Sequence, residues 1–345
     1  MPVRIALGHI DEHDDTVAQF AHQLGLKSLQ FHSPSNLPGE KGYWSVEELD
    51  ALRKDCERQG LAIEGLENVP LDHFWKIQRG LPGRDEQIEN YHTTLRNMAE
   101  TGYSLLGYNF LPTFVWRTDM EAKGRGGAAV TAFDAAKAHN GNALAAYKLT
   151  PAVEDEGRVL RREQMWDNYQ YFLDAVLPVA EEVGVRLALH PDDPPVVDAL
   201  GGVERLFVSP EGIAEAYRRA KGSPAWGLNL CLGTVSEMGG EEAVNEVIDL
   251  LGPEGKIFYV HFRDVRGTVP AFEECFLGEG NFDPARVIQR LHDRGFDSFI
   301  IDDHVPAMLG DGATWGDTSP ETYCSRGRAY SIGYLQGVLN GLKLD

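Results

Sequence analysis

The chain has 345 residues, of which 43% are hydrophobic and 25% are charged, so it can bury a full core without a second domain. Its formal net charge of −21 argues against nucleic acid and anionic membrane surfaces as partners, because both are bound through clustered Lys and Arg. Residues 1–15 lack a basic segment followed by an apolar one, and no apolar run reaches about 18 residues, so neither a secretory signal nor a membrane-spanning helix is expected.

Short apolar runs alternate with amphipathic stretches, which is typical of repeated strand–helix units and a parallel sheet. We expect strands at 3–10, 27–32, 61–67, 104–110, 185–190, 226–230, 257–261 and 298–302. We expect helices near 14–24, 45–59, 84–101, 163–183, 210–221, 241–250, 283–294 and 322–340. Eight such units favour a closed (β/α)₈ barrel, or TIM barrel, in one α/β domain over residues 1–345. A doubly wound open sheet is the alternative, but it gathers fewer strand ends at one point.

Local signals mark some helix boundaries. Ser45 followed by Glu48 predicts a capping box at the start of the second helix. Gly60 and Gly102 stand where the second and third helices should stop.

The stretch 111–162 interrupts the strand–helix rhythm after the fourth strand. It is longer than an ordinary loop of a barrel and contains glycine-rich, alanine-rich and acidic segments. We interpret it as an insertion over the carboxyl ends of the strands, acting as a lid that excludes water. The alternative is a disordered or oligomer-contacting loop.

The cysteines show no close pairing along the chain. They are Cys56, Cys231, Cys275 and Cys324. Such spacing without a secretory signal indicates reduced thiols in a cytoplasmic protein.

Four side chains that commonly bind metals stand at the ends of four successive predicted strands: His190, Cys231, His261 and Asp303. Gaps of about 30 to 40 residues separate them, which is one strand–helix unit each. Taken singly, each has an ordinary explanation, such as a core histidine, a small buried thiol or a helix cap. Together they predict a metal site, because the carboxyl ends of parallel barrel strands converge. Two imidazoles, a thiolate and a carboxylate suit a transition metal rather than magnesium or calcium.

Several motifs along nearly the whole chain resemble mannonate dehydratase, a family related to the xylose-isomerase-like barrels. The motifs are LALHPDDPP (187–195), NLCLGTVSEMG (229–239), VHFRDVRGT (260–268), GEGNFD (278–283) and DDH (302–304), with YWSVEEL (43–49), ENVP (67–70), YHTTLRNMAETG (91–102) and YNFLP before WRTD (108–119). The resemblance implies a manganese-type site on the same four ligands, with Fe²⁺, Co²⁺ or Zn²⁺ as alternatives. It also implies loss of water from an aldonic acid, such as D-mannonate going to 2-keto-3-deoxy-D-gluconate.

The sequence departs from that family at one motif. Members often continue their Asp-His pair with Gly-Arg, whereas DDH here runs into VPAMLGDG. If that Arg holds the substrate carboxylate, another must replace it. The candidates are Arg117, Arg263, Arg326 and Arg328.

Dehydration of a 2,3-dihydroxy acid needs a base at the α-carbon and an acid for the departing 3-hydroxyl. We assign these roles to His304, beside Asp303, and to Tyr323, in the segment SPETYCSRGRAY that resembles the family's catalytic tyrosine segment. The alternatives are a supporting role for His304 and an ordinary aromatic at a helix start for Tyr323.

Other polar residues, most of them at or after the ends of predicted strands, are expected to contact substrate. They are His32, Glu67, Tyr108, Asn109, Arg117, Asp119, Asp192, Arg263 and Arg328. Each has a structural alternative, such as satisfying a turn or pairing with a neighbouring charge.

No sequence motif for a nucleotide cofactor is present. GEGNFD lacks the spacing and the Lys of a P-loop, and no GxGxxG follows the first strand. No GxSxG nucleophile motif occurs either. A metal-dependent sugar isomerase or epimerase on the same barrel and a sugar-acid-binding protein without activity are the competing hypotheses. A homodimer or higher homo-oligomer is left open.

Overall fold

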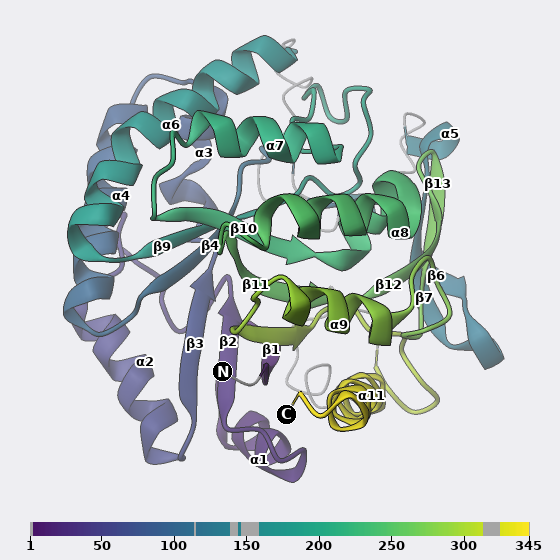
Figure 1. Ribbon diagram of the computed structural model, residues 1–345. Helices are drawn as coiled ribbons and strands as arrows, with labels where there is room; N and C mark the ends of the chain where they lie inside the picture. Colours follow the sequence, from purple (N-terminus) through teal and green to yellow (C-terminus); the bar gives the residue numbers. More distant parts are fainter. Residues whose placement is uncertain (1–2, 114, 139–143, 146–158, 313–324, 345) are drawn as a thin grey trace.

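A closed barrel of eight parallel strands forms the body of the computed structural model, which describes residues 3–113, 115–138, 144–145, 159–312 and 325–344 (Figure 1). The strands follow the order β1-β14-β11-β10-β9-β4-β3-β2 around the ring. Their bounds are β1 Arg4–Ile10, β2 Ser28–His32, β3 Ala62–Glu67, β4 Leu105–Asn109, β9 Arg186–His190, β10 Trp226–Cys231, β11 Ile257–Phe262 and β14 Phe299–Asp302. The predicted TIM barrel is therefore confirmed.

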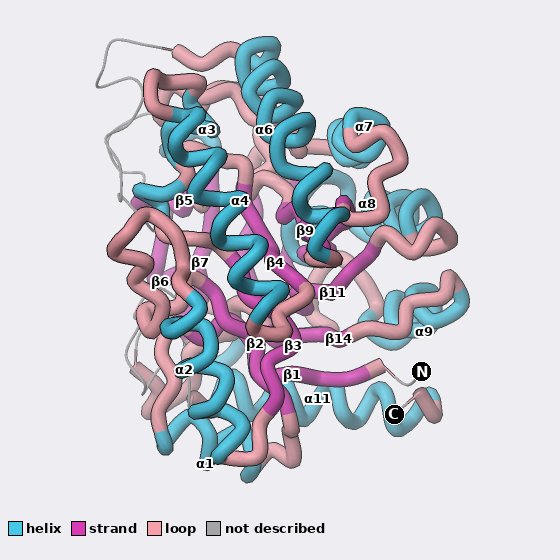
Figure 2. The backbone as a smooth tube through the Cα atoms, turned by 90° about the vertical axis from the view of Figure 1, so that its left-hand side faces the viewer, coloured by secondary structure: helices cyan, strands magenta, loops and turns pink. Residues whose placement is uncertain are grey.

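Helices connect the strands and surround the barrel (Figures 1 and 2). They are α1 Asp15–Gln23, α2 Val46–Arg58, α3 Trp75–Arg79, α4 Arg84–Glu100, α6 Arg162–Val183, α7 Pro210–Arg219, α8 Leu232–Leu251, α9 Pro284–Asp293 and α11 Arg326–Leu342. The predicted capping box is present: the Ser45 hydroxyl accepts from Glu48 N, and the Glu48 carboxylate accepts from Ser45 N. The chain ends meet where Val3 N donates to Leu344 O at 3.2 Å (Figure 2).

Two faces of the strands are buried, one toward the barrel axis and one toward the helices. All six residues of β10 and all six of β11 are buried. The axial cluster includes Leu105, Ala188, Tyr259 and Ile301, while the alternate residues of the strands join the larger core beneath the helices. None of the helices in the described ranges is both long and apolar enough to cross a bilayer.

One predicted helix boundary needs correction, and another cannot be compared with the structure. Helix α8 begins at Leu232, directly after β10, rather than at 241. The prediction placed the start after Gly239 and Gly240, but these glycines only kink the helix, with Gly240 at φ 68. The predicted start of the last helix at 322 lies outside the described residues, and α11 is described from Arg326.

The interruption after β4 forms small antiparallel sheets in its described part. Strand β5 (Trp116–Arg117) pairs with β8 (Leu144–Ala145), and β6 (Asp119–Lys123) pairs with β7 (Ala129–Asp134). Strand β7 also pairs with β13 (Ala271–Cys275), which pairs with β12 (Asp264–Thr268). The sequence analysis missed β12 and β13. The described part of 111–162 is thus joined to the loop after β11 in one sheet, while its interpretation as an insertion and a lid stays a prediction (Figure 1).

The cysteines that the structure describes, Cys56, Cys231 and Cys275, are free and buried. Cys324 lies outside the described residues. The cytoplasmic location stays a prediction.

The barrel closes between β1 and β14 at a point where only glycine fits. A Cβ on Gly8 would lie 2.3 Å from the Cβ of Ile301, an atom that cannot move without its strand. We expect Gly8→Ala to lower the free energy of unfolding by about 1–3 kcal/mol through overpacking. Gly333 in α11 is the control: a Cβ there meets nothing within 4 Å. Gly333→Ala should raise that free energy by about 0.5–1 kcal/mol. Urea unfolding of both variants measures the difference, and equal stabilities would contradict the close contact.

Candidate metal centre

Three of the four predicted ligands form one buried cluster at the carboxyl ends of neighbouring strands. Donor atoms of His190, Cys231 and His261 all lie within 4.8 Å of one another. Asp303 lies beside them, with Oδ1 3.6 Å from His261 Nδ1 and Oδ2 3.7 Å from Cys231 Sγ. The four side chains come from β9, β10, β11 and the residue after β14, which are consecutive in the barrel.

A buried carboxylate fixes the orientation of His261. Glu67 Oε2 lies 3.0 Å from His261 Nε2 and accepts from Tyr259 OH at 2.7 Å. Burial raises the pKa of Glu67, but His261, His32 and His190 together bring it well below its usual range. A proton on Nε2 satisfies the ionised carboxylate and leaves the lone pair on Nδ1, as in carboxylate–histidine–metal arrangements. His261 Nδ1 is buried and has no hydrogen-bond partner among the described residues, so it suits a cation.

The other two N and S donors are also held by their surroundings. His190 Nδ1 lies 2.6 Å from the carbonyl of Pro191, so a proton there directs Nε2 toward the cluster. Cys231 caps α8: its Sγ accepts from Thr234 N at 3.5 Å and from Thr234 Oγ1 at 3.1 Å. Donors fixed in this way, with the carboxylate of Asp303, form a set that fits a transition metal ion.

Asp303 is surrounded by positive or polarisable groups. Its Oδ2 accepts from Arg263 Nε at 3.0 Å, and its Oδ1 lies 3.7 Å from His304 Nε2. Burial raises the pKa of Asp303, but His304, His261 and Arg263 together bring it well below the usual range. Asp303 is therefore ionised, as a ligand must be.

His304 is held by a residue that the sequence analysis missed. Its Nδ1 lies 2.7 Å from Glu274 Oε1, and this oxygen also accepts from Arg117 Nη2 at 3.0 Å. Glu274 lies on β13, outside the barrel. No local signal distinguishes it from Glu273 beside it, because only the pairing of β13 with β12 and β7 brings it to the barrel.

His9 on β1 is the second residue missed. Its ring stacks on that of His32 with centroids 4.1 Å apart and an interplanar angle of 16°. Burial lowers the pKa of both rings, that of His32 to about 4. His9 stands near the end of the first predicted strand, so the pattern of metal-binding or polar residues at strand ends also includes it.

The structure brings some of the expected substrate contacts to this cluster. His32 Nε2 lies 3.1 Å from Asn68 Nδ2, and Asn109 Oδ1 accepts from the same Nδ2 at 3.0 Å. Glu67 is fully buried beneath His261, so it supports that ring rather than facing a ligand.

Others lie elsewhere or are occupied by protein groups. Tyr108 points toward the helices, where its hydroxyl lies 3.0 Å from Tyr169 OH, because alternate strand residues face outward. Asp119 is exposed and accepts from Glu121 N. Asp192 accepts hydrogen bonds from Leu206 N and Phe207 N. It therefore satisfies backbone donors, which is the structural role expected as the alternative to a contact with substrate. Tyr323 lies outside the described residues.

The arginines considered for the substrate carboxylate all have protein partners. Arg117 pairs with Asp193 and Glu274, and Arg328 with Asp302. Arg263 donates to Asp193, Glu237, Thr234 and Asp303. Arg326 donates to Leu309 O. Contact of any of them with a substrate carboxylate stays a prediction.

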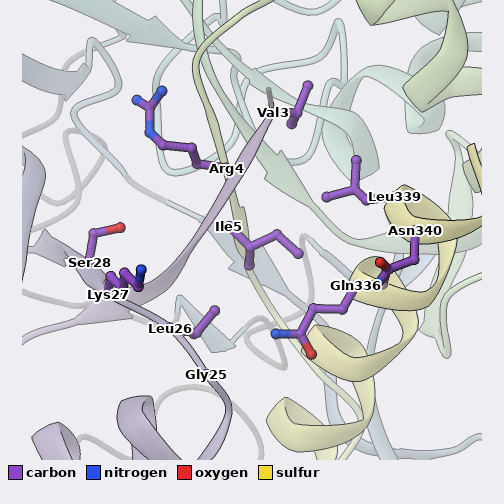
Figure 3. Close-up of a pocket in the computed structure, with 10 residues that line it drawn as sticks. All are labelled: Val3, Arg4, Ile5, Gly25, Leu26, Lys27, Ser28, Gln336, Leu339 and Asn340. Atoms are coloured by element: carbon purple, nitrogen blue, oxygen red, sulfur yellow. The ribbon is translucent and has the colours of Figure 1, made fainter. Parts of the chain in front are cut away.

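A separate pocket of about 410 Å³ lies at the other end of the barrel, where β1 and β2 begin beside α11 (Figure 3). Among the lining residues that the structure describes, the charged ones are Arg4 and Lys27. Its described lining residues include no His, Cys or carboxylate, so it is distinct from the cluster of His190, Cys231 and His261.

Comparison with known proteins identifies the family of this chain. The family model described as D-mannonate dehydratase (UxuA) matches residues 17–344. Mannonate dehydratase 2 of Halalkalibacterium halodurans is 31% identical over 315 residues, covering 86% of this chain and 87% of its own length. Mannonate dehydratase of Thermotoga neapolitana is 32% identical over 359 residues, covering 95% and 94%.

Solved structures share the fold. Mannonate dehydratase from Streptococcus suis serotype 2 superposes with a TM-score of 0.80 at 24% identity, covering 98% of this chain and 96% of its own. D-psicose 3-epimerase from Clostridium cellulolyticum H10 gives a TM-score of 0.60 at 13% identity, covering 98% and 99%. The family match over almost the whole chain and the curated relatives lead to one conclusion: this protein is a hydro-lyase that belongs to the D-mannonate dehydratase family.

Proposed function

We propose that this protein removes water from D-mannonate to give 2-keto-3-deoxy-D-gluconate, using a bound divalent metal ion. The observation that carries this proposal is the convergence of His190, Cys231 and His261 with Asp303 in a chain of this family. Sugar epimerases share the fold at low identity, which supports no activity, so we place epimerisation second. A sugar-acid-binding protein without activity is the remaining alternative.

Four side chains would hold the metal: His190, Cys231, His261 and Asp303. We propose Mn²⁺, with Fe²⁺, Co²⁺ and Zn²⁺ as alternatives. When bound, such an ion supplies the positive charge that stabilises an enediolate next to a carboxylate. Burial of the four ligands supports this role, since charge interactions strengthen where water is excluded.

The proton transfers fall to side chains of this protein. One base removes the proton from C2, and one acid protonates the 3-hydroxyl, which leaves as water while the enol becomes the 2-keto acid. We propose that His304 takes one role and Tyr323 the other. The Glu274 carboxylate beside His304 Nδ1 supports this role, because it favours a proton on Nδ1 and directs Nε2 toward Asp303.

Product analysis tests the reaction. Protein treated with chelator and reloaded with Mn²⁺ should convert D-mannonate to a 2-keto-3-deoxy acid, detected by the periodate–thiobarbituric acid colour. The chelated protein should be inactive, because the ligand side chains cannot replace the positive charge of the metal ion. A panel of epimeric aldonic acids serves as the control for substrate choice. An epimerised sugar acid as product, without the colour, would reject dehydration.

Glu274 provides a sharper test of the assignment of His304. We expect Glu274→Gln to keep the metal content and lower kcat about 10–100-fold, with a smaller change in KM, since the amide accepts a hydrogen bond but carries no charge. Glu273→Gln on the same strand is the matched control, because Glu273 is part-exposed and pairs with Arg266. Steady-state kinetics and elemental analysis measure both variants. Equal kcat values would remove Glu274 from the mechanism.

Beneath His304 and Asp303, buried charges surround Arg263. Glu237 Oε1 accepts from Arg263 Nη1 at 2.8 Å, but Glu237 Oε2 is buried without a hydrogen-bond partner among the described residues. Burial and the charge of Asp193 raise the pKa of Glu237 to about 7, against the opposing effect of Arg263. The folded state therefore favours the protonated form of Glu237.

This pKa predicts a pH-dependent stability. The folded pKa of Glu237 lies above the ordinary value of 4.5, so its contribution is greatest below that value and is lost as pH rises through about 7. Glu237→Gln does not titrate, so its Tm relative to wild type should rise between pH 5 and pH 8. Glu246→Gln, exposed on the same helix, is the control and should show a constant difference. A constant difference for Glu237→Gln as well would contradict the raised pKa.

A further inference from the structure

The four proposed ligands occupy one half of the barrel ring. They stand on β9, β10, β11 and β14, which are consecutive, whereas β1, β2, β3 and β4 complete the ring. In this closed order β1 lies four positions from β9 in either direction, so His9 stands across the ring from His190. A substrate between the two halves would meet the ligands on one side and the ends of β1–β4 on the other.

The ends of β1, β2 and β3 hold backbone strain. Five non-glycine residues in the described ranges have positive φ, and three of them, His9 at 57°, Ser33 at 48° and Asn68 at 57°, lie at or directly after these strand ends. A histidine in the left-handed region costs free energy that the surrounding structure must supply. Such strain at three adjacent strand ends indicates a functional constraint rather than a chance turn.

The strained backbone of His9 is held by the same group that orients His261. His9 N donates to Gln30 Oε1 at 3.0 Å, and Gln30 Nε2 donates to Glu67 Oε2 at 3.1 Å. The position of the His9 ring is therefore tied to the proposed metal ligand through Glu67.

The His9 ring lies at the accessible side of the cluster. Its Nε2 lies 3.9 Å from Asp303 Oδ1, and its ring meets that of His304 edge-on with centroids 5.7 Å apart. The side chains of His9 and His32 are 14% and 15% exposed, whereas those of His261 and Asp303 are 1% and 3% exposed. The two stacked rings are thus more accessible to solvent than these two proposed ligands.

We propose that His9 is a substrate-contacting residue, and that its imidazole, backed by His32, hydrogen-bonds a hydroxyl of the sugar acid beside Asp303 and across the ring from His190. This inference rests on the proposed function for the class of ligand. It explains why a histidine is kept at a backbone position that glycine would occupy without strain. His9, Asp303 and His304 also form a group with metal-ligand spacing, and the test below includes that alternative.

Replacement by glycine separates function from folding. His9→Gly relieves the strain and removes the imidazole, so its Tm should stay equal to that of wild type or rise, while KM for D-mannonate rises at least tenfold. Lys221→Gly is the matched control, because Lys221 has φ 54 on the surface, where it forms an ion pair with Asp174. The Tm of Lys221→Gly should likewise equal or exceed that of wild type, with KM unchanged. His9→Asn, which tolerates this backbone and keeps polar atoms, should recover part of the lost affinity.

Three outcomes would overturn the proposal. A KM for His9→Gly within twofold of wild type would remove the substrate contact. Loss of bound Mn²⁺ by elemental analysis would place His9 among the metal ligands instead. Unfolding of His9→Gly while Lys221→Gly folds would show that the ring serves the fold.

Calorimetric binding of D-mannonate to the Mn²⁺-loaded protein keeps this inference distinct from the proposed function. If wild type binds the acid without turnover, dehydration fails, and weaker binding by His9→Gly still supports the contact. If wild type turns over D-mannonate and His9→Gly matches it, the contact alone fails.

Discussion

The site depends on one buried carboxylate, that of Glu67. An ionised carboxylate removed from water is costly unless it is paired and hydrogen-bonded. Glu67 Oε2 meets this condition with donors from Gln30, Asn229 and Tyr259, together with His261 Nε2. The packing leaves no room for a side chain at Gly107 on β4, because a Cβ there would lie 2.1 Å from Tyr259 Oη. One charge in the barrel thereby fixes the ring of His261 and, through Gln30, the backbone of His9.

A second set of buried charges joins the loops outside the barrel to its strand ends. Arg117 comes from the insertion after β4, Asp193 from the loop after β9, and Glu274 from β13. Arg263 links them to Asp303 by donating to Asp193 and to Asp303 itself. Planar guanidinium groups suit this arrangement, since each presents five N–H donors in a rigid fork. The additional sheet is therefore part of the site and not an appendage, because it delivers the carboxylate beside His304.

The barrel ring divides the chemistry into two halves. Imidazole, thiolate and carboxylate groups stand on β9 to β14, where a cation would be held. Imidazole and amide groups stand on β1 to β4, where His32, Asn68 and Asn109 form a hydrogen-bonded row beside His9. Neutral hydrogen-bonding groups facing a charged cluster suit a ligand with a carboxylate at one end and hydroxyls along its length.

The sequence by itself determined the barrel, its eight strands and the convergence of His190, Cys231, His261 and Asp303, because strand ends in a parallel barrel meet at one place whatever the loops do. It also revealed the family through motifs at those ends. Only the tertiary structure decided which polar residues reach the cluster. Glu274 arrives through a sheet formed by two separate loops, Tyr108 faces outward by one-residue alternation, and His9 turns inward through a strained φ of 57°. These three placements depend on strand pairing, register and backbone angle. Contacts between residues distant in sequence set these properties, so a local sequence pattern does not reveal them.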